Sequence, residues 1–142
     1  MPCSFTIDLG VVEGVPLTRG KLWQRGTHQH IVYPGSDVYL AHAYNNRNIS
    51  KFEVWGSMAP NPDGSWDSSW TLLLDAEIVK PSGLPRGTNT EEDIAQFVAG
   101  DDFIFPATTT PVRYIRIKVT EVFDQSQGWF ITDEIRFWGM LK

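Results

Sequence analysis

The sequence predicts an all-β fold, an antiparallel β-sandwich of jelly-roll type with one short helix. Three observations lead to this class. Hydrophobic and polar residues alternate at period two, turn signals recur at short intervals, and aromatic residues, which favour strands, make up 13% of the chain. A length of 142 residues corresponds to one domain, and 42% hydrophobic residues can supply its core.

The clearest strand covers Arg113–Val119, where apolar and polar residues alternate. One face of this strand should therefore lie in the core, while Arg116 and its polar neighbours face outward. Similar patterns or short apolar runs predict strands at Phe5–Leu9, Leu17–Arg25, Asp37–Ala43, Lys51–Trp55, Trp70–Asp75, Phe103–Phe105 and Ile131–Trp138. The residues expected to point inward are Phe52, Val54, Ile115, Ile117, Val119, Ile131, Ile135 and Phe137.

One window has helical character, Glu91–Ala99. Thr90 can cap its first turn, Asp93 follows three residues later, and Gly100 stands where the helix should end. This combination is typical of a capping box and a glycine stop, so a short helix is expected.

Charge and composition exclude several classes of protein. Twelve Lys plus Arg against 17 Asp plus Glu give a net charge of −5, so no nucleic-acid partner is expected. No apolar run approaches the roughly 18 residues of a membrane span, and no membrane insertion by this domain is expected. Cys3 is the one cysteine, which excludes an internal disulfide and a cysteine-based zinc site.

Three stretches, taken in order, resemble the discoidin superfamily of coagulation-factor C-type or galactose-binding-like domains. They are Phe5–Gly10, Phe52–Ser57 followed by Asp63–Trp66, and Val112–Ile117 continuing through Asp133–Gly139. The resemblance implies a single discoidin-like domain over residues 1–142. Family members carry a further segment before the first of these stretches, so the chain is expected to lack its N-terminal segment.

The nearest resemblance is to discoidin-like domains of Bacteroidetes surface lipoproteins that serve glycan uptake. It rests on Leu22–Arg25, Trp55–Gly64 and Lys80–Pro85. It implies a place on the extracellular face of the outer membrane or in the periplasm, as part of a secreted lipoprotein. The implied partners are a glycan and neighbouring domains of a longer chain or a glycan importer.

The sugar-binding members of the superfamily are similar to family 32 carbohydrate-binding modules. The resemblance places Arg25, Asn46 or Asn48, and Trp129 at the positions that those modules use for the sugar. Arg and Asn side chains can bracket sugar hydroxyls, and an indole ring packs on the C–H face of a pyranose. The alternative is structural: Arg25 pairs with a surface carboxylate, the two Asn residues form a turn, and Trp129 fills an end of the core.

Two further sets of residues have open interpretations. On an extended segment His28 and His30 point to the same side, where they could widen the sugar site, bind a metal or remain solvated. The resemblance also places a structural calcium near Glu134, and the alternative is a solvated charge beside Arg136. No other cofactor is expected.

No catalytic constellation is predicted. The acidic residues lie mostly in polar turns, and no Gly-x-Ser-x-Gly segment or glycine-rich phosphate loop is present. The sequence therefore predicts a non-catalytic carbohydrate-binding module. The alternative is a structural or protein-docking module without a ligand of its own, because one fold can serve both purposes.

Overall fold

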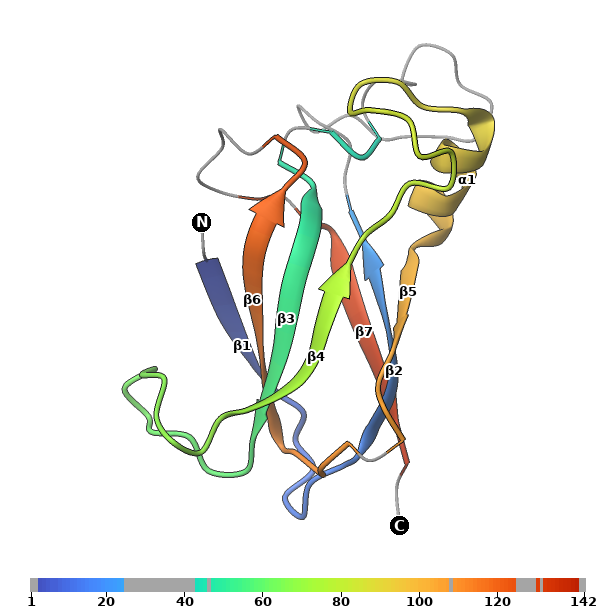
Figure 1. The fold of residues 1–142 in the computed structure, drawn as a ribbon. Coiled ribbons are helices and arrows are strands. Elements are labelled where there is room, and N and C mark those ends of the chain that lie inside the picture. Colours follow the sequence, from blue (N-terminus) through green and yellow to red (C-terminus); the bar gives the residue numbers. More distant parts are fainter. Residues whose placement is uncertain are drawn as a thin grey trace.

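The strands form two antiparallel sheets that face each other in a computed structural model of the protein (Figure 1). The structure describes residues 3–24, 43–45, 47–107, 109–124, 130 and 132–140. The elements are β1 (Cys3–Asp8), β2 (Leu17–Trp23), β3 (Ile49–Ser57), β4 (Thr71–Glu77), α1 (Glu91–Ala99), β5 (Asp101–Ile104), β6 (Tyr114–Val122) and β7 (Glu134–Gly139). One sheet has the order β1-β6-β3-β4 and the other β5-β2-β7. The predicted β-sandwich with one short helix is confirmed.

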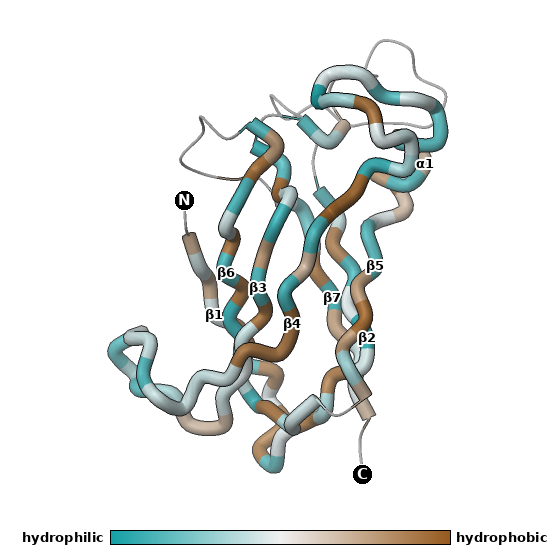
Figure 2. The backbone as a smooth tube through the Cα atoms, viewed as in Figure 1, coloured by the Kyte–Doolittle hydropathy of each residue, from teal (hydrophilic) through white to brown (hydrophobic). Residues whose placement is uncertain are grey.

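The predicted alternation is confirmed in the central strands β3 and β6. These strands pair antiparallel with Val54 opposite Ile117. Phe52, Val54, Ile115, Ile117 and Val119 are at most 1% exposed and belong to the core between the sheets. The alternation is visible as changes between hydrophilic and hydrophobic residues along the strands in Figure 2. Burial of one face of each strand fixes the register, because a slip of one residue would expose that face.

Strand boundaries differ slightly from those expected. β2 ends at Trp23, and β7 begins at Glu134. Ile135 and Phe137 of β7 are half-buried and pack against the core, as predicted. Ile131, and the expected strand at 37–43 apart from Ala43, lie outside the described residues.

The helix α1 is confirmed with the bounds that its sequence predicts. Thr90 Oγ1 accepts a hydrogen bond from Asp93 N at 3.2 Å, and Thr90 N donates to Asp93 Oδ2 at 3.0 Å. Gly100 ends the helix with a φ of 95°, a conformation that favours glycine. Local contacts define both ends of the helix. The capping box supplies acceptors for N–H groups at the start, and Gly100 N donates to Gln96 O at the end.

The helix lies at one end of the sandwich, where β2, β4 and β6 finish and β3, β5 and β7 begin (Figure 1). We call this the α1 end. Phe97 of the helix packs edge-on against Tyr44 with ring centroids 5.0 Å apart, and Tyr44 is fully buried. Within the described ranges no helix has the length and apolar character to cross a membrane.

Arg116 differs from the expectation for an outward-facing residue of β6, since it is only 4% exposed. The loop between β3 and β4 places two indole rings on its guanidinium, whose carbon lies 4.6 Å from the Trp66 centroid and 4.2 Å from that of Trp70. Arg116 also donates to Thr6 Oγ1 at 2.8 Å and to Ser65 O at 3.1 Å. Cation–π contacts and hydrogen bonds thus replace the solvent that the charge loses.

Replacing Trp66 with Ala should destabilise the domain by about 1–2 kcal/mol, because it removes one of the two indole rings that contact the Arg116 guanidinium. Urea unfolding followed by circular dichroism measures the loss. Trp138→Ala is the matched control, since Trp138 is also partly exposed and lies under Arg19 at 4.5 Å. Arg19 is already half exposed, so the control should lose less than about 1 kcal/mol. Equal losses of unfolding free energy in the two variants would contradict a stabilising contact between Trp66 and Arg116.

Candidate functional site

At the α1 end, side-chain and backbone hydrogen bonds join the termini of three strands. Gln24, which follows β2, donates from Nε2 to Ile49 O at 3.1 Å, and its Oε1 accepts from Ile49 N. Because β2 and β3 belong to different sheets, this amide links the two layers. Asp133 N donates to Trp23 O at 3.0 Å, which places the start of β7 beside the end of β2.

The segments that carry the predicted sugar contacts are attached at these termini. Residue 25 follows Gln24, residue 48 precedes Ile49, and residue 129 comes shortly before Asp133. The structure therefore brings the ends of all three segments to one end of the sandwich. The predicted site residues that lie outside the described residues are Arg25, His28, His30, Asn46 and Trp129. Their contacts with a sugar stay predictions.

Asn48 is described, and it is almost fully buried. Its Oδ1 accepts from Asn45 N at 3.0 Å, and its own N donates to Asn45 O at 2.9 Å, so it closes the 45–48 turn. Its carbonyl accepts from Phe123 N at 3.0 Å, which ties the turn to the end of β6. The turn-forming alternative thus describes what Asn48 does in this structure, and a sugar contact from it stays a prediction.

Glu134 opens β7 and is half exposed. Its Oε1 lies 3.2 Å from Arg136 Nη2, the neighbour that the sequence suggested. No group of three or more His, Cys, Asp or Glu side chains in the described part of the chain is placed to hold a metal ion. The calcium near Glu134 therefore stays a prediction.

The loop between β4 and α1 is built around a buried lysine that sequence reasoning missed. The Lys80 ammonium donates to Thr88 O at 2.6 Å and to Pro85 O at 3.0 Å, and it lies 4.0 Å from Asp93 Oδ2. Asp93 in turn accepts from Ser82 N and Oγ at 2.9 and 2.6 Å. A basic residue next to Pro and Gly normally indicates a solvated turn, so the sequence offered no signal for this interior position.

Both buried charges have shifted pKa values. Burial lowers the pKa of the Lys80 ammonium, and the Asp93 carboxylate partly opposes this. For Asp93 burial alone would raise the pKa, but hydrogen bonds from Ser82 and Thr90 and the charge of Lys80 together hold it below its usual value. The remaining donors and acceptors of this pair are satisfied by loop atoms.

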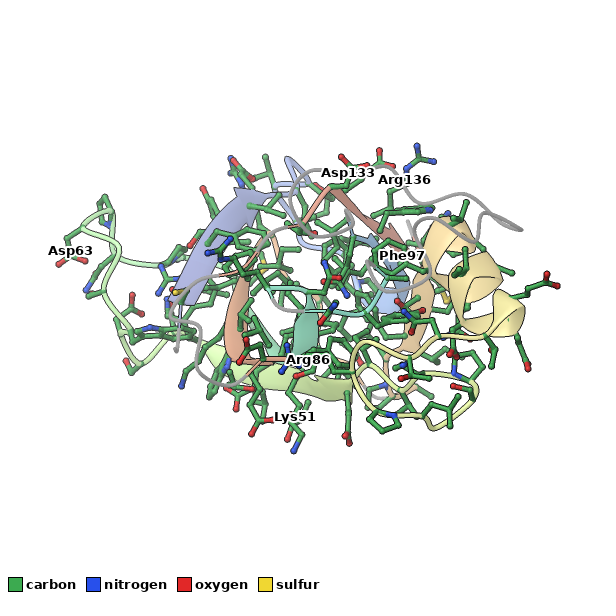
Figure 3. All side chains as sticks on the ribbon, turned by 90° about the horizontal axis from the view of Figure 1, so that it is seen from above. Lys51, Asp63, Arg86, Phe97, Asp133 and Arg136 are labelled. Carbon is green, nitrogen blue, oxygen red and sulfur yellow. The ribbon has the colours of Figure 1, made fainter. Side chains whose placement is uncertain are left out.

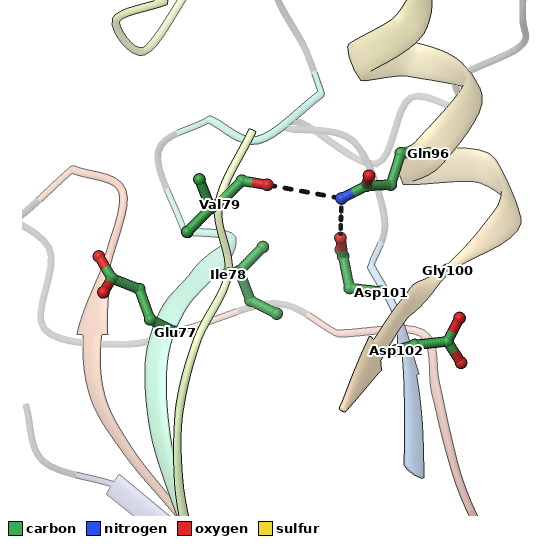
Figure 4. A pocket seen from close by; sticks show the side chains of 7 residues that line it. All are labelled: Glu77, Ile78, Val79, Gln96, Gly100, Asp101 and Asp102. Atoms are coloured by element: carbon green, nitrogen blue, oxygen red, sulfur yellow. Dashed lines mark hydrogen bonds between the residues drawn. The ribbon is translucent and has the colours of Figure 1, made fainter. Parts of the chain in front are cut away.

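A second buried network lies below α1. Asp101 Oδ1 accepts from Tyr44 Oη at 2.9 Å. It also accepts from Gln96 Nε2 at 2.7 Å, and Gln96 donates weakly to Val79 O at 3.4 Å (Figure 4). Burial raises the pKa of Asp101 to about 6 and also raises that of the Tyr44 hydroxyl. Tyr44 has a φ of 48°, unfavourable for an aromatic residue, and its hydrogen bond and ring packing hold it there.

A pocket of about 340 Å³ opens beside this network, between the ends of β4 and α1 and the start of β5 (Figure 4). It is lined by Glu77, Ile78, Val79, Gln96, Gly100, Asp101 and Asp102. The sequence did not predict it, because residues 77–79 and 96–102 meet only through the stacking of the two sheets. Its carboxylates and carbonyls accept hydrogen bonds.

Gln24→Leu should destabilise the domain by about 2–4 kcal/mol, because it leaves the N–H and C=O of Ile49 buried without partners. Gln24→Glu keeps the shape but buries a carboxylate against the Ile49 carbonyl, so it should also be less stable than the wild type. Denaturant unfolding of the three proteins measures both losses. A loss below about 0.5 kcal/mol for Gln24→Leu would show that the link between the sheets contributes little.

Asp101→Asn should make stability less dependent on pH. The pKa of Asp101 is raised from 3.8 to about 6 on folding. Folding therefore favours its protonated form, and this contribution is lost as pH rises from about 4 to 6. An Asn keeps the oxygen that accepts from Tyr44 and Gln96. We expect the variant to match the wild type near pH 4 and to exceed it by on the order of 1–2 kcal/mol at pH 7. Melting curves of both proteins across this pH range give the comparison. The same pH dependence of stability in both would refute the raised pKa of Asp101.

Comparisons with known proteins agree with this architecture. The chain belongs to the DUF5000 family, described as a domain of unknown function, whose model matches residues 1–139. The structure of SusE-like protein BT2857 is 41% identical, with a TM-score of 0.77 over 97% of this chain and 70% of that one. The third carbohydrate-binding module of family 32 (CBM32-3) from a Clostridium perfringens family 31 glycoside hydrolase is 15% identical, with a TM-score of 0.60 over 99% and 68%. Curated protein sequences gave no significant match.

These neighbours confirm the fold that the sequence motifs suggested, a β-sandwich like that of a family 32 carbohydrate-binding module. At 15% identity the likeness to the clostridial module concerns the fold alone. One neighbour is named a SusE-like protein and the other a carbohydrate-binding module, and these names agree with the expectation of a non-catalytic domain.

Proposed function

We propose that this domain is a carbohydrate-binding module of a glycan-utilisation protein. The observation that carries the proposal is the convergence at the α1 end, where hydrogen bonds through Gln24, Asn48 and Asp133 hold together the ends of three loop segments. Loops on a rigid β-scaffold are the usual location of a binding site. The 41% identity to a SusE-like protein supports a role in glycan uptake.

The proposed site works through complementary contacts with one sugar. A guanidinium and amides bond directed hydroxyls, an indole packs on the C–H face of the ring, and imidazoles widen the rim. The residues proposed for these roles are Arg25, Asn46, Asn48, Trp129, His28 and His30. We expect weak affinity, because a shallow site built from loops makes few contacts and must desolvate many hydroxyls.

The proposal extends to the cellular setting. The chain resembles Bacteroidetes surface lipoproteins and has a SusE-like relative. Both support a place at the extracellular face of the outer membrane or in the periplasm. Within such a lipoprotein the domain would adjoin further domains or a glycan importer. A structural calcium near Glu134 belongs to the same proposal.

A docking module is the alternative, and one observation favours it. On the outer face of β5-β2-β7, Ile104 and Trp138 flank Arg19 in register, and both apolar side chains are exposed. Met140, just beyond β7, is exposed as well. A neighbouring domain or transporter subunit could cover these residues.

A glycan array tests the binding proposal. The wild-type domain should bind galactose-type or related terminal glycans, and Trp129→Ala should weaken binding at least about tenfold, because stacking is lost. Arg25→Ala should weaken it similarly. Trp138→Ala is the control, since it removes an exposed indole from another surface.

Two results would contradict the proposed site. Undiminished binding by Trp129→Ala and Arg25→Ala would place the ligand elsewhere. A blank array from the folded wild-type domain would favour the docking role, and weaker binding by Trp138→Ala alone would assign the ligand to the outer sheet face.

A further inference from the structure

The loop between β4 and α1 is held by polar contacts, and most of its surface is exposed. Residues 83–88 are all exposed, so apolar burial contributes little to holding them. Its backbone is held instead by the Lys80 ammonium, which donates to Pro85 O and Thr88 O. These two carbonyls lie on either side of Arg86 in the chain. The buried charge thus fixes the backbone from which the Arg86 side chain extends.

The same loop is tied to the turn that precedes β3. Asn89 Nδ2 donates to Ala43 O at 2.7 Å. This contact brings the Arg86 backbone to the α1 end, where the proposed sugar-binding segments are attached. Figure 3 looks onto that end and shows Arg86 beside the strand ends.

Arg86 contacts two residues that flank those segments. Its Nη1 lies 3.4 Å from Asn45 Oδ1 and 3.5 Å from Asp124 Oδ2, and its side chain is 42% exposed. Asn45 immediately precedes Asn46, and Asp124 immediately precedes residues 125–129. Both distances exceed that of a normal hydrogen bond, so each of these two contacts is weak and can give way to a ligand hydroxyl.

We infer that Arg86, Asn45 and Asp124 form a further part of the binding site, which takes vicinal hydroxyls of a neutral glycan. This inference rests on the proposed function. A guanidinium donates, a carboxylate accepts, and an amide does both, so the set matches the donor and acceptor pattern of a diol. Asp124 balances the charge of Arg86, so these three residues together favour a neutral sugar over an acidic one.

Affinity electrophoresis tests this inference, using native gels that contain galactan, arabinogalactan, mannan or xylan, or acidic polygalacturonate. A neutral polysaccharide should retard the wild-type domain. Arg86→Gln should weaken that retardation about fivefold or more. Arg86→Lys should retain part of it, because Lys keeps the charge but lacks the paired N–H donors of the guanidinium. Arg19→Gln is the matched control, an arginine of similar exposure paired with Asp102, and it should behave as wild type.

The outcomes separate the inference from the proposed function. Retardation of the wild type that Arg86→Gln leaves unchanged overturns the inference and leaves the function standing. A preference for polygalacturonate overturns the neutral class. A wild type that no gel retards and no arrayed glycan binds overturns the proposed function itself. Melting curves of the Arg86 variants exclude misfolding, and loss in Arg86→Gln with a wild-type melting temperature supports the inference.

Discussion

One amide side chain connects the two halves of this sandwich at the end where function is proposed. Gln24 follows the central strand of one sheet, and both of its hydrogen bonds go to the backbone of Ile49, which opens a strand of the other sheet. Backbone ladders hold each sheet together, but they cannot set the position of one sheet on the other. The core does this through apolar packing, and Gln24 adds directed contacts at the point where three loop segments are attached.

The helix and the loop before it extend this frame. Asp93 caps α1, bonds Ser82 and lies next to the Lys80 ammonium, so the carboxylate serves helix and loop together. Tyr44 connects the turn before β3 to the helix through Phe97 and to β5 through Asp101. Buried polar groups of this kind stabilise only when every member is satisfied. Their concentration at the α1 end, with an apolar core between the sheets, is what a preformed binding surface requires.

The fold could be predicted from the sequence because its signals are local. Period-two alternation in β3 and β6 reports a buried face directly, and Thr90, Asp93 and Gly100 define α1 within a few residues. The burial of Arg116 could not be predicted, since it depends on Trp66 and Trp70 returning from a loop about fifty residues away. Lys80 has the same difficulty, because its partners are carbonyl oxygens that any residue supplies.

The candidate site, too, could be predicted from the sequence only in part. Motif resemblance located the segments that meet at the α1 end, and the structure brings their strand termini together. The motif resemblance could not indicate Arg86, because the position of Arg86 depends on the packing of Lys80. Nor could it assign Asn48 to the 45–48 turn in preference to a ligand, because a turn and a sugar contact use the same amide.

Nuclear magnetic resonance with the ¹⁵N-labelled domain tests most directly whether the α1 end is the ligand-binding face. The arrayed glycan that binds most tightly is titrated while backbone amides and indole N–H signals are followed. We expect the shifts to concentrate at the α1 end, including Asn45, Ile49, Asp124 and Asp133, while the indole signals of Trp66 and Trp138 stay unchanged. Shifts confined to Trp66 or to Trp138 and Ile104, with none at the α1 end, would contradict it.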